Sequence, residues 1–251
     1  MRKYALLSLC DNTTRKLFDK STFPYMQNYC DFVDADLFIY GEDADAQNWI
    51  KTHEIIDQFK WGVNAKFKYL KELFKQYERI LIIDADVLIL KTAPNIFNIV
   101  PTDCIGACNE FHNRQYSPRQ EEMVIKPTKI YNEILIRHGR KPYDLKKWDG
   151  AYFNNGIMVV SREHVDIFEE PLEYFSTKTH IQDYTNFLFR YYNVKMFDLP
   201  YEFNRFMIGQ PTIATVESSY FLHFAAVYAD YSVRCMVIDE VATLLKEKNL
   251  L

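Results

Sequence analysis

Short apolar runs alternate with amphipathic stretches along much of the chain. A short, continuous apolar run indicates a strand that is buried on both faces. Strands are expected at residues 4–9, 37–40, 79–83, 157–160 and 220–224. Apolar residues at helical spacing predict helices at 45–59, 63–77, 129–138, 181–191 and 240–248. The succession of strand, helix and strand predicts an α/β fold with a parallel, doubly wound sheet.

Two aspartates, Asp84 and Asp86, interrupt the apolar run of residues 79–90. They follow an expected strand, and ligands of doubly wound sheets bind at the carboxyl ends of strands. Their spacing places both on one face of an extended chain. Carboxylates beside a buried strand are costly without a positive partner. Carboxylates that leave room for phosphate oxygens suit Mg²⁺ or Mn²⁺. The pattern predicts a divalent-metal site for a phosphorylated substrate; the alternative is a structural turn with capping aspartates.

The Asp-Ala-Asp triplet occurs three times, so the triplet alone is weak evidence. The copy at 34–36 precedes an expected strand and should lie at the opposite edge of the sheet. The copy at 43–45 lies in an acidic stretch after Gly41 and is expected to be solvated. Only the copy at 84–86 has apolar runs on both sides.

Composition is that of a globular protein, with 48% hydrophobic and 25% charged residues. A net charge of −4 argues against a nucleic-acid groove, so an anionic substrate would depend on local cations. We find no repeat, low-complexity tract or linker, and expect one domain over residues 1–251.

Five scattered cysteines show no paired metal-ligand pattern, which favours reduced thiols and a cytoplasmic protein. No segment approaches the roughly 18 apolar residues that span a bilayer. The first apolar run ends at Asp11 and is too short for a signal peptide.

Five segments of the chain form an ordered set that extends over most of its length. They are residues 66–97 with the triplet at 84–86, Phe153-Asn154-Asn155-Gly156 with the strand that follows, Gln182-Asp183-Tyr184-Thr185-Asn186, Leu199-Pro200-Tyr201-Glu202-Phe203-Asn204, and Tyr220-Phe221-Leu222-His223-Phe224. In this order they resemble the glycogenin-like retaining glycosyltransferases of family 8. The resemblance implies the GT-A fold, with a Rossmann-like, mixed and mostly parallel central sheet flanked by helices. It also implies a nucleotide-binding half at 1–100 and an acceptor-binding half at 101–251.

The resemblance implies a metal site. Asp84 and Asp86 would hold Mn²⁺, or Mg²⁺, with His223 as the third protein ligand. Without the resemblance, a lone histidine on an apolar strand is more often a satisfied core residue.

The resemblance also implies donor contacts. The residues concerned are Asp11, Asn12, Lys66, Asp84 and Asn154. Asp11 and Asn12 match the strand end that contacts the nucleotide base, and their alternative is a helix cap or turn. Lys66 could instead belong to a solvated helix face, and Asn154 to a turn before Gly156.

The catalytic residues implied are Gln182 and Asp183. Gln182 matches the position that faces the anomeric carbon, where an amide would stabilise an oxocarbenium-like state. The Asp-Gln pair of the family is Ile181-Gln182 here, so one carboxylate is missing. Asp183, Asp149 or Asp144 could replace it.

A second departure follows His223. The glycine, lysine and tryptophan that come after this histidine in the family are absent here. That lysine meets the donor diphosphate, and Arg234 or Arg205 could supply its charge instead.

We therefore expect a metal-dependent glycosyltransferase that moves a hexose from a nucleotide-diphosphate sugar to a glycan or other hydroxyl acceptor, with retention. The expected partners are this donor and acceptor, and no nucleic acid. One alternative is a GT-A protein that binds nucleotide sugars without efficient turnover, which the two departures favour. Another is a phosphatase of the haloacid dehalogenase type, whose Asp-x-Asp motif needs Thr or Val where this chain has Leu88.

Overall fold

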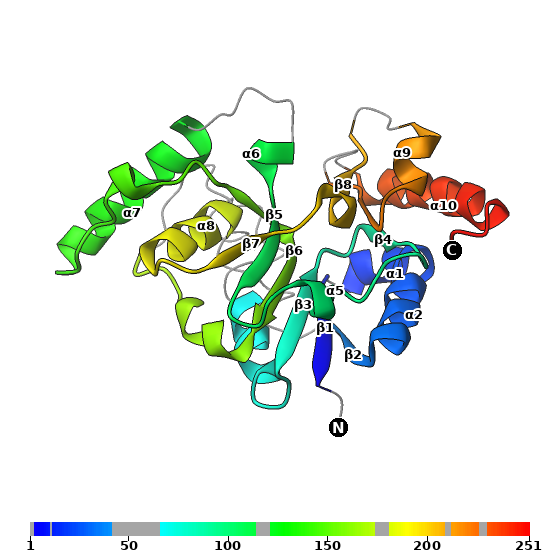
Figure 1. Ribbon diagram of the computed structural model, residues 1–251, viewed down its shortest axis with the longest axis horizontal. Helices are drawn as coiled ribbons and strands as arrows, with labels where there is room; N and C mark the ends of the chain where they lie inside the picture. The colour runs from blue at the N-terminus through cyan, green and yellow to red at the C-terminus, as the bar shows by residue number, and fades with distance from the viewer. Residues whose placement is uncertain are drawn as a thin grey trace.

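A six-stranded sheet forms the centre of the protein in the computed structural model (Figure 1). The structure describes residues 3–10, 12–41, 66–113, 121–173, 181–208, 212–225 and 230–251. The strands of this sheet are β1 (Tyr4–Leu9), β2 (Ala35–Tyr40), β3 (Arg79–Ile83), β5 (Ile105–Asn109), β6 (Phe153–Ser161) and β7 (Met196–Asp198). Their order is β2-β1-β3-β6-β5-β7.

The sheet is mixed and mostly parallel, as expected. β1 pairs in parallel with β2 and β3, and β5 pairs in parallel with β7. β6 lies antiparallel between β3 and β5. The carboxyl ends of β3 and β5 therefore lie at the same edge as the amino end of β6.

A second, three-stranded sheet continues from the end of β3. It contains β4 (Val87–Ile89), β8 (Arg205–Phe206) and β9 (Phe221–His223), in the order β4-β9-β8. β4 and β9 are antiparallel, and their register pairs Val87 with His223. This pairing brings the end of β9 beside Asp86. The second sheet was not expected from the sequence.

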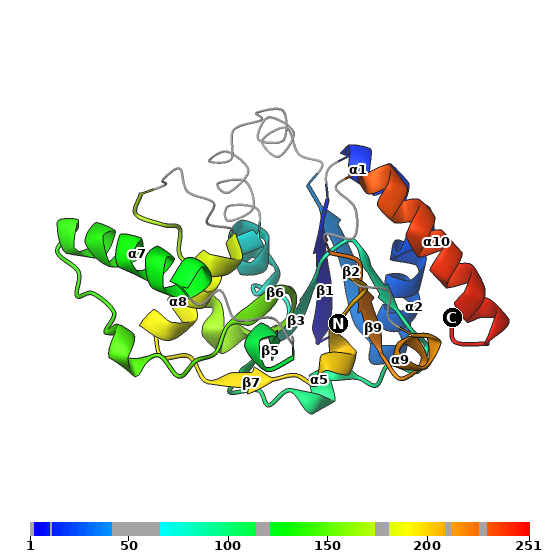
Figure 2. The ribbon, with the colours of Figure 1, turned by 90° about the horizontal axis from the view of Figure 1, so that it is seen from above.

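Helices cover both faces of the central sheet. They are α1 (Asn12–Ser21), α2 (Phe23–Val33), α5 (Ile96–Ile99), α6 (Glu110–Asn113), α7 (Lys126–Arg137), α8 (Ile181–Tyr191), α9 (Ile213–Glu217) and α10 (Tyr231–Glu247), with a further helical segment at 66–73. Shorter turns are a π-helical turn at Glu121–Ile125 and 3₁₀ turns at Leu145–Lys147, Arg162–Ile167 and Tyr201–Phe203. Figure 2 shows α7 and α8 on one side, and α1, α2 and α10 on the other.

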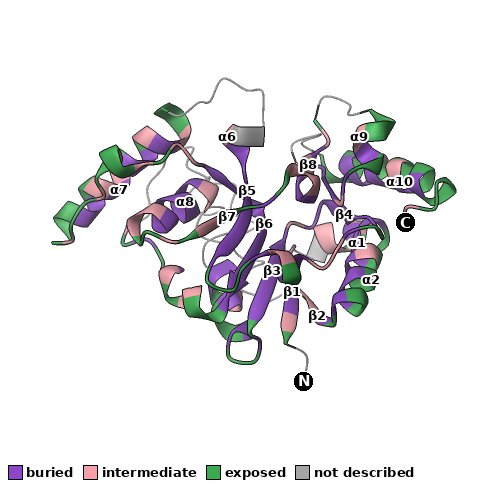
Figure 3. Cartoon of the chain, in the orientation of Figure 1, coloured by how far each residue is buried: buried purple, intermediate pink, exposed green. Residues whose placement is uncertain are grey.

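The core consists of two apolar clusters, one on each face of the sheet. Along β3, Ile80 and Ile82 belong to the cluster that also contains residues of α7 and α8. Leu81 and Ile83 belong to the cluster that contains residues of α2 and α10. Figure 3 shows the central strands as almost continuously buried. Burial on both faces explains why β3 is a continuous apolar run in the sequence.

Several expected boundaries differ from those observed. β2 begins at Ala35, so Asp36 lies inside a strand and accepts a hydrogen bond from Tyr77. β6 begins at Phe153, so Asn154 lies in a strand rather than in a turn. α10 begins at Tyr231 instead of residue 240, because the side chain of Asp230 caps its first turn.

Some expectations lie outside the described residues. They are the helix at 45–59, the start of the helix at 63–77, the triplet at 43–45 and Asp11. All five cysteines are buried, and none forms a disulfide. Among the described residues, no helix combines the length and apolar character that crossing a bilayer requires.

The turn at residues 84–86 carries the chain from one sheet to the other, and three elements hold its backbone. The amide of Asp84 donates to Gly156 O of β6 (2.7 Å), and Phe224 N donates to Asp86 O (3.0 Å). The hydroxyl of Thr22, just before α2, donates to Ala85 O (2.6 Å) and is buried. The position of both aspartates is therefore fixed by the backbone before any ligand binds.

We expect Thr22→Val to lower the free energy of unfolding by about 1–3 kcal/mol, because it leaves the buried carbonyl of Ala85 without a donor. Thr22→Ser keeps the hydroxyl and loses only a methyl group, at a cost of about 1 kcal/mol. Urea unfolding of both variants measures the difference. A valine variant as stable as the parent protein would show that the bond to Ala85 contributes nothing.

Candidate functional site

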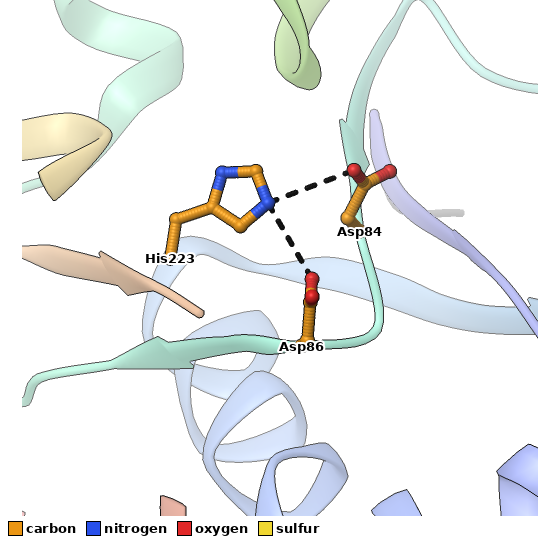
Figure 4. A group of neighbouring side chains, drawn as sticks. All are labelled: Asp84, Asp86 and His223. Carbon is orange, nitrogen blue, oxygen red and sulfur yellow. Dashed lines mark ion pairs between the residues drawn. The ribbon is translucent and has the colours of Figure 1, made fainter. Parts of the chain in front are cut away.

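Three side chains converge at the junction of the two sheets. Figure 4 shows the imidazole of His223 turned toward the carboxylates of Asp84 and Asp86. The Nε2 atom lies 3.7 Å from Asp84 Oδ2 and 3.4 Å from Asp86 Oδ1. One candidate ligand atom from each residue lies within 4.8 Å of the others. Two carboxylates and an imidazole form a donor set that could hold a divalent ion.

A hydrogen-bond chain fixes the orientation of the His223 ring. The Nδ2 group of Asn204 donates to Asn154 Oδ1 (2.9 Å), so the oxygen of Asn204 is left to face His223 Nδ1 (2.8 Å). The network thus assigns a proton to Nδ1. Nε2 is buried and has no hydrogen-bond partner. Nε2 faces two carboxylates and can bind either a proton or a metal ion. Either one would place a positive charge beside the two carboxylates.

Asp86 is buried and ion-paired. Its Oδ2 accepts a hydrogen bond from Arg234 Nη1 of α10 (2.6 Å), and its Oδ1 faces His223. Burial acts to raise the pKa of Asp86, but His223 and Arg234 outweigh it and hold the pKa below its usual value. Asp86 is therefore an anion at neutral pH.

Asp84 is more open and has a different cation. Its side chain is 42% exposed, and its Oδ1 lies 3.6 Å from the ammonium group of Lys66. Lys66 is buried and donates to Asn155 O (2.9 Å). The solvated-face interpretation of Lys66 is wrong, because the side chain reaches inward to the aspartate and to β6.

A second polar cluster adjoins the first and contains Gln182. Asn154 Nδ2 donates to Glu110 Oε1 (2.8 Å) and to Gln182 Oε1 (3.1 Å), and Gln182 Nε2 donates to Glu110 Oε1 (3.0 Å). Asn154 also accepts from Asn204, which links this cluster to His223. Gln182, Glu110 and Asn154 thus form a closed triangle beside the Asp84, Asp86 and His223 group.

Sequence reasoning missed Glu110. The residue is buried and directly follows β5, as Asp84 directly follows β3. The strand before it was not recognised, so its place at the ligand edge could not be inferred. A carboxylate that meets Gln182 is therefore present, but it belongs to Glu110, at the start of α6, and not to Asp183, Asp149 or Asp144.

Those three aspartates have other partners. Asp183 is buried and accepts a hydrogen bond from the Tyr152 hydroxyl (2.5 Å). Asp149 accepts from Ala151 N (3.0 Å), and Asp144 accepts from Lys146 N (3.1 Å), so both cap local turns.

Arg234 and Arg205, the two arginines that could replace the lysine of the family, lie in different surroundings. Arg234 adjoins the three candidate metal ligands and contacts one of them, Asp86. Arg205 donates to Ser219 Oγ (3.1 Å) and stacks over the ring of Tyr201 (4.4 Å). Only Arg234 adjoins the aspartates. Asp11 lies outside the described residues, and Asn12 begins α1.

Gly156 leaves room for this arrangement. A Cβ atom at this position would lie 2.6 Å from Asp84 Oδ2 and 2.6 Å from His223 Cε1. Both distances are far below van der Waals contact. The glycine of the Asn-Asn-Gly segment is thus explained by the close approach of two candidate metal ligands.

A family model and several solved structures are similar to this chain. The family model described as "Glycosyl transferase family 8" matches residues 65–228. A search of curated proteins gave no match.

Solved structures share the fold across nearly the whole chain. A glycosyltransferase involved in the glycosylation of the major capsid of PBCV-1 superposes with a TM-score of 0.59 at 13% identity, covering 94% of this chain and 98% of that one. The galactosyltransferase LgtC, in complex with donor and acceptor sugar analogs, gives 0.51 at 13% identity, covering 95% of each chain. The bifunctional WbbM glycosyltransferase gives 0.55 at 13% identity over 94% of this chain and 49% of its own length. The fold is that of GT-A glycosyltransferases.

We expect Gly156→Ala to weaken Mn²⁺ binding by about tenfold or more, because the added methyl group displaces Asp84 and His223 from each other. Isothermal titration calorimetry of the protein with Mn²⁺ measures the effect. Gly139→Ala is the control: its backbone φ of +70° makes alanine cost about 1–2 kcal/mol, but open space surrounds it. Equal losses of Mn²⁺ affinity in both variants would contradict a local effect.

Proposed function

The chain belongs to glycosyl transferase family 8 and is a glycosyltransferase, and we propose that it transfers a hexose from a nucleotide-diphosphate sugar to a glycan or other hydroxyl acceptor. The transfer proceeds with retention and depends on Mn²⁺ or Mg²⁺. Residues 1–251 act as one catalytic domain, with the nucleotide bound by residues 1–100 and the acceptor by residues 101–251. The observation that carries the proposal is His223 Nε2, which is buried, without a hydrogen-bond partner and directed at two carboxylates.

Asp84, Asp86 and His223 are the residues that would hold the ion. When bound, a divalent ion supplies Lewis-acid stabilisation for the charge that develops on a leaving nucleoside diphosphate. The two carboxylates are balanced by Lys66 and Arg234, so a divalent ion would leave a net positive site. Such a site attracts the diphosphate of a donor.

Arg234 takes the place of the lysine that the family has after its histidine. It comes from α10 and contacts Asp86, so it is placed at the metal-ligand group. Its planar guanidinium can bind a phosphate group with two parallel hydrogen bonds. Lys66, Asp84 and Asn154 complete the donor contacts, and the expected contacts of Asp11 and Asn12 with the base belong to the same proposal.

Gln182 stabilises the oxocarbenium-like state at the anomeric carbon. Glu110 and Asn154 hold its amide, which removes the freedom of a long side chain before the sugar arrives. Asp183 follows Gln182 on α8 and is held by the hydroxyl of Tyr152. Because Asp183 lies next to Gln182 in the first turn of α8, its carboxylate stabilises the positive charge that develops at the anomeric carbon.

The presence of Glu110 and Arg234 favours turnover over the rival interpretation, a protein that only binds nucleotide sugars. The family motifs lack a carboxylate before Gln182 and a lysine after His223 in this chain, and these two departures suggested weak turnover. Glu110 supplies a carboxylate near Gln182, and Arg234 supplies a cation near His223. The family match disfavours the phosphatase interpretation.

We expect Asp84→Asn to lower Mn²⁺-dependent transfer or hydrolysis about 10²–10³-fold, because one anionic ligand of the site is lost. A thermal-shift screen of nucleoside diphosphates and their sugars, with and without Mn²⁺, first identifies the donor. Release of the nucleoside diphosphate from that donor is then measured.

The matched control is Asp34→Asn in another Asp-Ala-Asp triplet. Asp34 ends α2 with a backbone φ of 57°, a conformation that asparagine tolerates. Its activity should equal that of the parent protein. Retention of most of the activity in Asp84→Asn, with its fold intact by circular dichroism, would refute the metal-site assignment.

We expect Glu110→Gln to lower kcat about 10–100-fold with little change in donor KM, because a charged acceptor of two hydrogen bonds becomes neutral. Mn²⁺ affinity should stay within about threefold, since Glu110 accepts hydrogen bonds from Asn154 and Gln182, which are not candidate metal ligands. Glu121→Gln, at an exposed position, is the control. An unchanged kcat would remove Glu110 from the reaction.

A further inference from the structure

A cavity of about 700 Å³ lies apart from the metal-ligand group. Its walls are loop 141–151, the carboxyl-terminal half of α8 and the residues from 193 to β7. Figure 1 shows α8 beside β7 at this place. None of Asp84, Asp86 and His223 lines it. Its volume falls in the range of about 300–1,000 Å³ that is typical of small-molecule sites.

Arg190 of α8 lines this cavity with an incompletely satisfied guanidinium. Its Nη2 donates to Thr128 Oγ1 (3.3 Å), whereas Nε and Nη1 are buried without a hydrogen-bond partner. Burial lowers the pKa of Arg190 to about 10, so the side chain remains charged at neutral pH. A buried cation is costly unless an anion meets it. An anionic ligand group would supply the missing acceptors.

Two further cations, Lys141 and Lys147, line the same cavity. Both are exposed, and neither has an ion-pair partner among the described residues. The cavity also contains Asp144 and Asp149, but each accepts a backbone hydrogen bond in its own turn. Asp149 attracts Arg190, as does the nearby Asp183, but the three cations of the lining outnumber its two carboxylates.

Aromatic rings supply flat apolar walls. Tyr143, Phe189 and Tyr191 line the cavity. The backbone of Tyr143 is tied in both directions to the side chain of Asn132 in α7, at 2.8 Å for each hydrogen bond. The loop that carries this ring and the lysines is therefore preformed. Aromatic rings can pack against the apolar faces of sugars, and the cations can bind an acidic group. The lining therefore suits a saccharide that bears an acidic group.

We propose that this cavity binds the acidic part of the acceptor, a saccharide with a carboxylate or phosphate group held by Arg190, Lys141 and Lys147. The choice of a saccharide rests on the proposed function. α8 connects the two sites, since Gln182 lies in its first turn and Arg190 in its last. Arg190 lies eight positions after Gln182, a rise of about 12 Å along the helix, and a short oligosaccharide spans this distance.

Binding is tested by calorimetry without metal or nucleotide, so the result does not depend on catalysis. The probes are an oligosaccharide that contains uronic acid, a sugar phosphate and a neutral oligosaccharide of equal length. We expect at least one acidic probe to bind tenfold or more tightly than the neutral one, and the two acidic probes distinguish carboxylate from phosphate. Added salt should weaken this binding.

Matched variants locate the site. Lys147→Ala and Arg190→Gln should each lower the affinity for the acidic probe severalfold or more. Lys146→Ala should leave this affinity unchanged, because Lys146 is the neighbouring lysine that does not line the cavity. Lys147 is exposed, so its variant retains the fold even if Arg190→Gln does not. Equal affinity for acidic and neutral probes, no binding of either acidic probe, or equal effects of Lys146→Ala and Lys147→Ala would overturn the proposal.

The two proposals fail separately. Binding of the acidic probe that survives Asp84→Asn supports the cavity even if transfer is absent. Transfer to a neutral acceptor, together with no binding of the acidic probes, overturns the cavity proposal alone.

Discussion

The structure depends on one constraint: the side chains of Asp84 and Asp86 lie together in the turn that joins the central sheet to the smaller sheet. The strand β3 of the central sheet ends just before Asp84, and β4 of the smaller sheet begins at Val87, so the two carboxylates lie within a single turn. Lys66, Arg234 and His223 reach this turn from three different elements. Backbone bonds from Gly156 and Phe224 set its position. The charges are thus compensated from several directions around a fixed backbone, which is the condition for a preorganised site.

The compensation also explains how the family pattern is altered. Each candidate replacement comes from a different element than the residue that it replaces: Glu110 follows β5, and Arg234 lies on α10. In the proposed function, a charge near the junction is kept although a different segment supplies it. A site of this kind tolerates loss of a motif residue when another element already approaches the same edge.

Much of the central sheet follows from the sequence, because strands buried on both faces read as continuous apolar runs. Residues 79–83 and the aspartates after them are the clearest case. The approach of His223 could not be predicted from the residues alone, because it depends on the register between β4 and β9, which lie far apart in the chain. The first turns of α10 were missed because Val233 and Met236 are exposed and break the apolar stripe. β5 was missed because Gly106, Ala107 and Cys108 are small and resemble a loop.

The separation of the ligands along the chain has a consequence for synthesis. Asp84 and Asp86 emerge early, whereas His223 and Arg234 follow well over a hundred residues later. Until then the two neighbouring carboxylates repel each other without the imidazole and the guanidinium that meet them in the folded chain. Vectorial synthesis therefore delays closure of the junction until residues 223 and 234 have been made.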